Sequence, residues 1–182
     1  ETTAGNISLT ATNDVNLDGT VDASGNMTVT QTATTGSVNF NVQVDVDNDL
    51  TITGDDVEVN IVNSVAGDIS ITASGNDVTI DGAIDAAKGN VTLVTQTAVG
   101  GDVLASDEIN AQNDITITAA DQINVDEVNS DGAGSAVVGA VPPAFDGRRL
   151  REFGVRLRVR PHRPRDSDRD SVVGTHRDAS RT

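Results

Sequence analysis

One short pattern recurs along the first two thirds of the chain and constrains the fold more than any other feature. Each copy begins with Gly or Asn, continues with Asn or Asp, and then places two apolar residues on either side of a Ser or Thr. The copies begin at Gly5, Gly25, Asn48, Gly67, Gly89 and Asn113. Their steps of 20, 23, 19, 22 and 24 residues are typical of a stacked repeat protein, in which each unit packs only on its neighbours.

The apolar pairs of these copies predict the core. Residues two apart on a strand point to the same side, so each pair faces one way and the hydroxyl residue between its members faces solvent. If the copies stack in register, equivalent residues lie about 4.8 Å apart and form columns of aliphatic side chains. The pairs are Ile7/Leu9, Met27/Val29, Leu50/Ile52, Ile69/Ile71, Val91/Leu93 and Ile115/Ile117.

The two residues that precede each pair predict a turn. Gly and Asn tolerate a positive φ at the lowest cost, so we expect every copy to begin with the same left-handed turn. The Asn or Asp that follows has a short polar side chain, which we expect to bond the backbone groups of its own turn.

A second strand-like run follows each copy, such as DVNLDGTVDA from Asp14 and DVTIDGAIDA from Asp77. A coil of about 20 residues with two or three short strands has the size of one rung of a parallel β-helix. An immunoglobulin-like module needs roughly 100 residues and about seven strands, which does not fit this period. We therefore predict an all-β, right-handed parallel β-helix (solenoid) of about six rungs, roughly 29 Å long, with the hand taken from the general crossover preference.

A longer period overlies the short one. Equivalent copies in the two halves of the repeat lie 62, 64 and 65 residues apart, and the string TQTA occurs at residues 30–33 and again at 95–98. Each long unit therefore contains three short ones.

Composition divides the chain into two parts. Before Pro142 one cationic side chain, Lys88, accompanies 22 acidic ones, a balance of 1 − 22 = −21, whereas 11 Arg and 6 acidic residues from Pro142 onward give 11 − 6 = +5. We assign residues 1–131 to the β-helix repeat and residues 132–182 to a Gly-, Pro- and Arg-rich tail. We expect this tail to be disordered, to be a basic arm, or to be the repeat gene translated out of frame. The last interpretation arises because codons for RDSDRDS, residues 165–171, can be read one base later as alternating Val and Thr.

Three phrases of the repeat, ASGNMTVTQTA, AGDISITASGNDVTIDGAIDA and KGNVTLVTQTA, resemble the repeats of filamentous haemagglutinin-type adhesins, which are large bacterial exoproteins. The resemblance covers residues 5–131 and implies a long right-handed β-helix that is secreted or lies at the outer cell surface. It also implies a host or surface receptor that is bound by regions outside this chain. The chain begins with ETTAGN, without the pattern of a signal peptide, so we expect a fragment whose export signal lies upstream.

The stretch NDVNLDGTVDASG, residues 13–25, resembles the calcium loop of dockerin modules, with oxygen ligands at alternate positions and a glycine at the sixth. Its twelfth position is Gly25, where such a loop needs an acidic ligand. The counterpart of this stretch at residues 76–89 keeps the apolar residues but has Thr79 at the middle ligand position. We therefore interpret the stretch as strand and turns, with no metal site. The candidate ligands are Asp14, Asn16, Asp18 and Asp22.

We interpret the other acidic stretches as solvated surface residues and not as metal ligands or catalytic groups. A second calcium candidate, residues 45–56, has Leu50 where the loop needs a glycine. We expect no cofactor, apart from weak calcium binding by stacked surface carboxylates, and we interpret Asp55 and Asp56 as a solvated turn. We expect no catalytic residues, since no Arg or His precedes Pro142 and Lys88 lies in a predicted turn.

Composition also limits the partners. The repeat region has one aromatic residue, Phe40, which we expect in the core instead of on a carbohydrate platform. The acidity of the repeat opposes nucleic-acid binding, and no apolar run reaches the length of a transmembrane segment. The glycosylation triplets at Asn6, Asn26 and Asn90 are what the turn and hydroxyl columns generate by chance.

These observations predict a non-enzymatic shaft segment of a large secreted or cell-surface bacterial adhesin, in which each rung adds length. Two alternatives stay open. One is the non-catalytic part of a β-helical polysaccharide-processing enzyme, and the other is a calcium-binding surface repeat protein.

Overall fold

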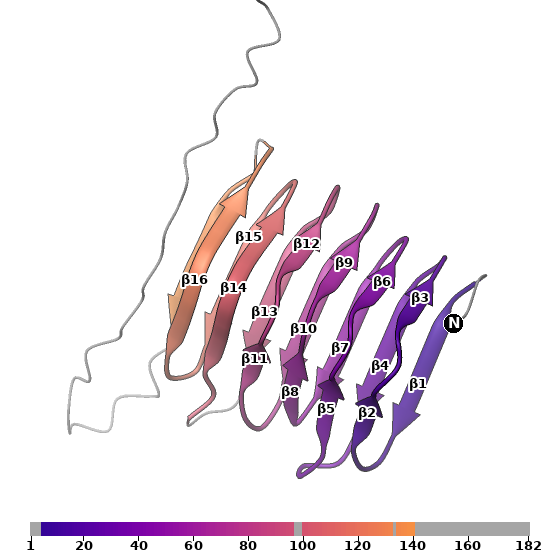
Figure 1. Ribbon diagram of the computed structural model, residues 1–182. Helices are drawn as coiled ribbons and strands as arrows, with labels where there is room; N and C mark the ends of the chain where they lie inside the picture. The colour runs from indigo at the N-terminus through magenta and orange to yellow at the C-terminus, as the bar shows by residue number, and fades with distance from the viewer. Residues whose placement is uncertain (1–4, 97–99, 133, 141–182) are drawn as a thin grey trace, which may run out of the picture.

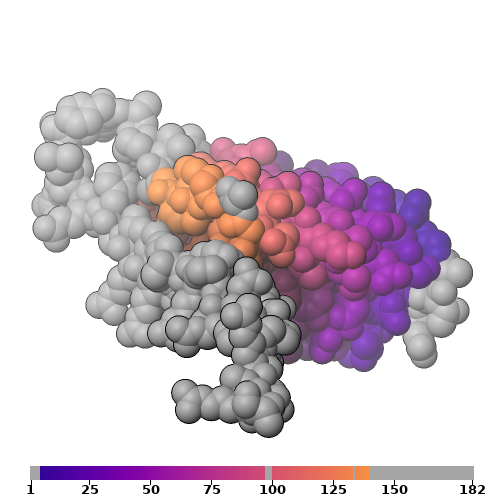
Figure 2. Space-filling view, turned by 90° about the horizontal axis from the view of Figure 1, so that it is seen from above, coloured from indigo at the N-terminus to yellow at the C-terminus, as the bar shows by residue number. Residues whose placement is uncertain are grey.

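The structure, a computed structural model, describes residues 5–96, 100–132 and 134–140. Those residues form seventeen strands and no helix. The chain winds in successive turns, so that each strand lies parallel to the equivalent strand of the preceding turn (Figure 1). Figure 2 shows the same order on the surface, where the colour changes steadily along the axis from the first turn to the last. The predicted all-β parallel solenoid of about six turns is confirmed.

One face of the solenoid is a seven-stranded sheet, here called sheet A, to which each turn contributes one strand. Its strands are β1 (Ile7–Ala11), β4 (Met27–Gln31), β7 (Leu50–Gly54), β10 (Ile69–Ala73), β13 (Val91–Thr95), β15 (Ile115–Ala119) and β17 (Ala136–Ala140). Every neighbouring pair is in register, so the first apolar positions stack from Ile7 to Ile115 as predicted. The β-branched residues of these strands suit a pleated sheet that is buried on one side.

Sheet B consists of two stacks of short strands that are joined by one long strand. The first stack contains β2 (Val15–Leu17), β5 (Ser37–Phe40), β8 (Asp56–Val59) and β11 (Val78–Ile80). The second stack contains β3 (Val21–Ala23), β6 (Val44–Val46), β9 (Val62–Ser64) and β12 (Ile84–Ala86). Strand β14 (Val103–Ala111) pairs with β11 at its start and with β12 at its end. Strand β16 (Ile123–Ser130) covers β14, with a register shift between Ala105 and Glu108.

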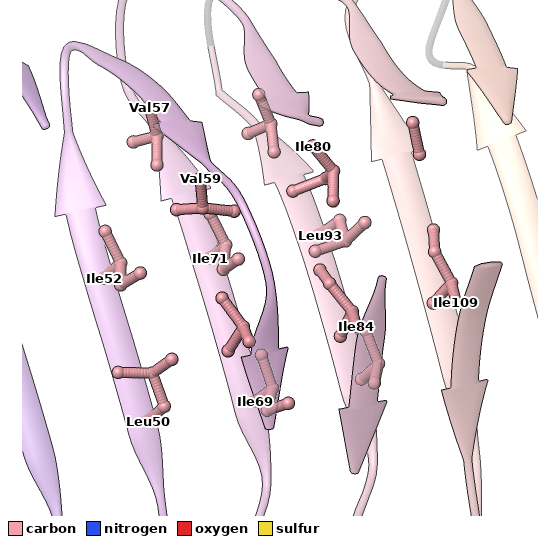
Figure 3. Close-up of a cluster of buried hydrophobic side chains, with 14 of the residues drawn as sticks. Leu50, Ile52, Val57, Val59, Ile69, Ile71, Ile80, Ile84, Leu93 and Ile109 are labelled. Carbon is pink, nitrogen blue, oxygen red and sulfur yellow. The ribbon is translucent and has the colours of Figure 1, made fainter. Parts of the chain in front are cut away.

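Aliphatic columns fill the interior, as the sequence predicts. Ile71 of β10 lies between Ile52 of β7 and Leu93 of β13, and all three side chains are fully buried. Figure 3 shows side chains of sheet A pointing across the interior toward those of sheet B, such as Val59 and Ile80. The burial of each Leu or Ile side chain contributes roughly 1.5–3 kcal/mol to stability.

The solenoid extends beyond Asp131, where we expected the repeat region to end. Strand β17 pairs in register with β15 and adds the first strand of a seventh turn. Its inward residues are the small Ala136 and Val138, and Val137 replaces the outward hydroxyl residue, so the alternation that marks the other copies is missing. The Arg-rich tail from residue 141 onward lies outside the described residues.

At three of the four copies that begin with glycine, close packing and not a left-handed turn requires this residue. Gly5 has a positive φ of 100°, but Gly25, Gly67 and Gly89 do not, so the prediction of one shared left-handed turn is wrong. A Cβ atom at Gly89 would collide with the carbonyl group of Gly67, and one at Gly67 would collide with the backbone of Asn48. Successive turns therefore approach so closely at Gly67 and Gly89 that a side chain would not fit there, whereas the corner accommodates Asn48 and Asn113 in other turns.

Candidate functional site: side-chain ladders at the corners

A ladder of Asn and Asp side chains runs along the corner where each turn enters sheet A. Its members, here called the first ladder, are Asn6, Asn26, Asp49, Asp68, Asn90 and Asp114. The Oδ1 atom of each member accepts a hydrogen bond from the backbone N–H of the equivalent residue in the next turn, at N···O distances of 2.8–3.4 Å. We expected these side chains to bond within their own turns. They bond between turns instead, because the N–H group at the entry to each strand points along the axis.

A second ladder runs along the corner between sheet A and sheet B. Its members are Asp14, Ser37, Asp56, Asp77, Asp102 and Gln122. The Oδ1 atom of Asp77 accepts from the N–H of Asp102 at 2.8 Å, and the Oδ1 atom of Asp102 accepts from the N–H of Gln122 at 2.9 Å. The backbone N–H of Asp77 bonds Asp56 in the same way. Three consecutive turns therefore place like charges in one column.

Burial and like charge both act on this column. Loss of hydration raises the pKa of Asp56, and the charge of Asp77 raises it further. Loss of hydration also raises the pKa of Asp102, to which the charges of Asp77 and Asp121 add. The hydrogen bonds from the backbone oppose these effects because they favour the ionised form. The net effect is that ionisation of Asp56 and Asp102 costs the folded state free energy.

The residues of the first calcium candidate, residues 13–25, bond neighbouring turns of the solenoid. Asp14 accepts from the N–H of Ser37 at 3.0 Å, Asn16 accepts from Asn39 Nδ2 at 2.9 Å, and Asp18 accepts from Asn41 Nδ2 at 2.8 Å. Each of these three oxygens thus bonds the following turn. In the described part of the chain, no group of three or more His, Cys, Asp or Glu side chains is placed to hold a metal ion.

The second calcium candidate, residues 45–56, is dispersed over several elements. Asp45 Oδ1 on β6 accepts from Gln43 Nε2 at 2.9 Å and from Asn63 Nδ2 at 2.8 Å, while Leu50 is buried in a core column. The oxygens of this stretch therefore bond neighbouring amides and the next turn.

Asp55 corrects one prediction. We expected Asp55 and Asp56 to form a solvated turn, but Asp55 is only 6% exposed. Its backbone N–H donates to Gln31 Oε1 at 2.9 Å, and its Oδ2 atom accepts from Asn76 Nδ2 at 3.2 Å. It is the single residue between β7 and β8, and the next turn covers it, since a Cβ atom at Gly75 would collide with its carboxylate.

Two buried polar side chains close the same corner and were missed by sequence reasoning. Gln31 Nε2 donates to the carbonyl oxygens of Thr12 and Ala33 at 3.1 and 2.9 Å, in addition to the bond that its Oε1 atom accepts from Asp55. Thr95 is the fifth residue of β13, as Gln31 is of β4, and its hydroxyl donates to the carbonyl oxygen of Gly101 at 3.0 Å. The two TQTA strings are therefore one residue out of structural register, and this offset concealed the shared position.

Sequence reasoning also missed two pairs of acidic residues on sheet B. Burial raises the pKa of Glu58 on β8, and a hydrogen bond to Asp81 and the charge of Asp81 raise it further. Burial likewise raises the pKa of Asp85 on β12, with a further contribution from Asp131. The members of each pair are 23 and 46 residues apart in the sequence. Alignment of the second strand-like runs, and not only of the first, could have revealed them.

The remaining candidate residues lie in structural positions. Phe40 on β5 is 2% exposed, which confirms its predicted place in the core, and Lys88 is exposed between β12 and β13 as predicted. The Asn residues of the three glycosylation triplets belong to the first ladder. Nδ2 of Asn90 donates to Asp68 Oδ1 at 3.0 Å, so a glycan on Asn90 would disturb the ladder.

Comparison with protein-family models, curated proteins and solved structures finds no match for this chain. None of the described residues belongs to a helix that is long and apolar enough to cross a membrane. The function is therefore inferred from the fold, the ladders and the surface.

Proposed function

We propose that this chain is a structural shaft segment of a large bacterial adhesin that is secreted or displayed at the cell surface. The observation that carries this proposal is the unbroken register of sheet A, in which seven strands stack without a bulge. Each further turn lengthens such a stack by about 4.8 Å. The number of turns alone can therefore set how far a binding tip stands from the cell.

The contacts between turns support a stiff rod. The aliphatic columns tie each turn to the next inside, and the first ladder ties them at the corner with side-chain to backbone hydrogen bonds. Because every turn uses the same contacts, stability is approximately a sum over neighbouring turns. Such a structure tolerates added or removed turns.

The exterior supports a passive role. With a balance of −21 before Pro142, the repeat repels other anionic surfaces and resists nonspecific association. In this proposal, a host or surface receptor is bound by parts of the adhesin outside this chain.

The proposal is tested in the bacterium that carries the full gene. An antibody against this chain should label intact cells or the medium, and in-frame removal of residues 5–66, one three-turn unit, should leave export and adhesion in place. Labelling only after the cells are opened would contradict the location. Loss of a glycan-cleaving activity after the deletion would contradict the shaft and favour a polysaccharide-processing enzyme.

A further inference from the structure

The outward side chains of sheet A form a two-dimensional array of hydroxyl groups. Strands β1, β4, β7, β10, β13 and β15 each place two side chains on this face, which gives twelve positions. Eleven of the twelve are Ser or Thr, and the exception is Val94. The first column contains Ser8, Thr28, Thr51, Ser70, Thr92 and Thr116, and the second contains Thr10, Thr30, Thr53, Thr72 and Thr118. We call these eleven residues the hydroxyl array.

The outward positions of sheet B show that solvation alone does not explain the array. The middle residues of its short strand segments give twelve comparable positions, of which nine are Asn or Asp. They are Asn16, Asn39, Glu58, Thr79, Leu104 and Asn124 in the first stack and Asp22, Asp45, Asn63, Asp85, Asn110 and Asn129 in the second. Only Thr79 has a hydroxyl group. Both sheets are solvated and extended, so the preference for hydroxyl groups is a property of the sheet A face.

The geometry of the array is regular in both directions. Equivalent residues of neighbouring strands are directly paired, without the register shift that interrupts β14 and β16. Figure 1 shows these strands running parallel with little change of direction. The hydroxyl groups therefore repeat every 4.8 Å or so along the axis and about every 6.6 Å along a strand, across two residues.

The chemistry of the face argues against several other partners. No strand of sheet A contains a charged or aromatic residue. A nucleic acid would need cationic side chains, protein hot spots are rich in Trp, Tyr and Arg, and sugar-binding faces usually contain aromatic side chains. A neutral lattice of hydroxyl and methyl groups instead fits a partner that is itself a neutral, hydrogen-bonding lattice.

We propose that the hydroxyl array binds the surface of ice. Its repeat along the axis is close to the shorter oxygen repeat on the prism face of hexagonal ice, and its repeat along the strand is somewhat shorter than the longer one, so water held over the array can bridge the two lattices. Each Thr hydroxyl can donate one hydrogen bond and accept two, and branching at Cβ restricts its rotamers. A face that is ordered before binding loses little conformational entropy when it binds, and bridging waters between its hydroxyl groups cost little.

The test uses the purified full chain, frozen slowly onto a chilled probe, with the protein in the ice measured against that left in the liquid. The wild type should enter the ice, while serum albumin should be excluded. Thr72→Lys, in the second column, should lower the ice-bound fraction at least about tenfold, which corresponds to roughly 1.4 kcal/mol. Thr79→Lys, in the same turn on sheet B, and Thr72→Ser, which keeps the hydroxyl group, should bind like the wild type.

Melting curves by circular dichroism control for the folding of each variant. Exclusion of the wild type from ice would overturn the proposal, as would equal losses for Thr72→Lys and Thr79→Lys. Two other results would assign the hydroxyl array to a different partner and overturn the proposal. In both, the wild type stays out of the ice. It binds microcrystalline cellulose in one and dimerises in sedimentation in the other, and Thr72→Lys removes that binding or dimerisation. These outcomes leave the shaft proposal unchanged, because surface labelling and the deletion test it separately.

Discussion

The two sheets of the solenoid are alike on the inside and different on the outside. Both line the interior with Val, Ile, Leu and Ala, and both stack these residues turn on turn. Outside, sheet A presents neutral hydroxyl groups in unbroken register, whereas sheet B presents mostly Asn and Asp and contains a register shift. The interior therefore determines the fold, and the exterior of each sheet is free to meet a different requirement.

Charge follows the same division. No strand of sheet A contains an acidic residue, so the acidic residues that the structure describes lie on sheet B and at the corners. The two corners also differ from each other in charge. The first ladder mixes Asn with Asp and places at most two Asp residues, Asp49 and Asp68, in succession. The second ladder places three in succession, which are Asp56, Asp77 and Asp102. Electrostatic repulsion is therefore concentrated beside sheet B.

The largest effect is expected from a comparison of the same substitution on the inner and on the outer side of sheet A. Ile71→Asp places a charge in a fully buried column and should cost at least about 4 kcal/mol, enough to unfold a marginal domain. Thr72→Asp, on the outer face, should cost less than about 1 kcal/mol. Circular dichroism melts measure both, and equal damage would show that the assigned register is wrong.

A smaller effect tests the close approach of the turns. Gly89→Ala pushes a methyl group against the carbonyl group of Gly67 and should cost about 1–3 kcal/mol. Gly19→Ala is the matched control, because no atom lies within 4 Å of the added methyl group. Its unfolding midpoint in urea should equal or slightly exceed that of the wild type, since Ala restricts the unfolded chain more than Gly does. If the two variants melted alike, close packing would not be the reason for the glycine at the corner.

Most of the fold could be predicted from the sequence, because the stacking of turns repeats the same local pattern. Ile7, Met27 and their equivalents occupy the predicted columns, since a buried column tolerates only apolar residues. Strand β17 was missed because Ala136 and Val138 are small and Val137 breaks the alternation. The role of Gly67 and Gly89 was misread because their constraint comes from another turn.

The ladders were harder to predict because their partners are far apart in the chain. The bond between Gln31 and Asp55 spans 24 residues, and the contact between Glu58 and Asp81 links two turns. Local sequence shows which side chains are polar. It does not show that an oxygen bonds the backbone of the following turn, because that depends on how the turns align.

The pH dependence of stability should reveal the repulsion beside sheet B. The pKa values of Asp56, Glu58, Asp85 and Asp102 are raised in the folded chain, in each case first by burial. Groups with a raised pKa contribute stability that is fully present below their unfolded pKa values of about 4 and is lost as the pH rises through the folded values. The melting temperature should therefore rise as the pH is lowered from about 7 toward the ordinary carboxyl value of about 4, and added salt should reduce the difference. A melting temperature that falls over this range would contradict the assignment.

The smallest effect on stability is expected when one charge is removed from each ladder in turn and the two variants are compared. Asp77→Asn keeps the Oδ1 acceptor for the N–H of Asp102 and removes a charge beside Asp56 and Asp102, so it should stabilise the fold by about 0.5 kcal/mol. Asp114→Asn is the control in the first ladder, where the neighbouring members are the neutral Asn90 and Ser135, and it should have no measurable effect. Chemical denaturation at neutral pH and low salt makes this comparison. Equal effects would show that charge is not what distinguishes the corners.

The length added by each turn is the property on which the proposed shaft depends, and a pair of spin labels measures it directly. The chain has no Cys, so cysteines introduced at Thr28 and Thr116 carry the only labels, and these positions lie four strand steps apart in sheet A. Double electron–electron resonance should give a narrow distribution of distances between the labels, for a backbone separation of about 19 Å over four steps. Insertion of a second copy of residues 5–66 before Gly67 should increase this separation to about 34 Å, for seven steps. An unchanged distance, or a broad distribution after the insertion, would contradict a stiff rod that lengthens turn by turn.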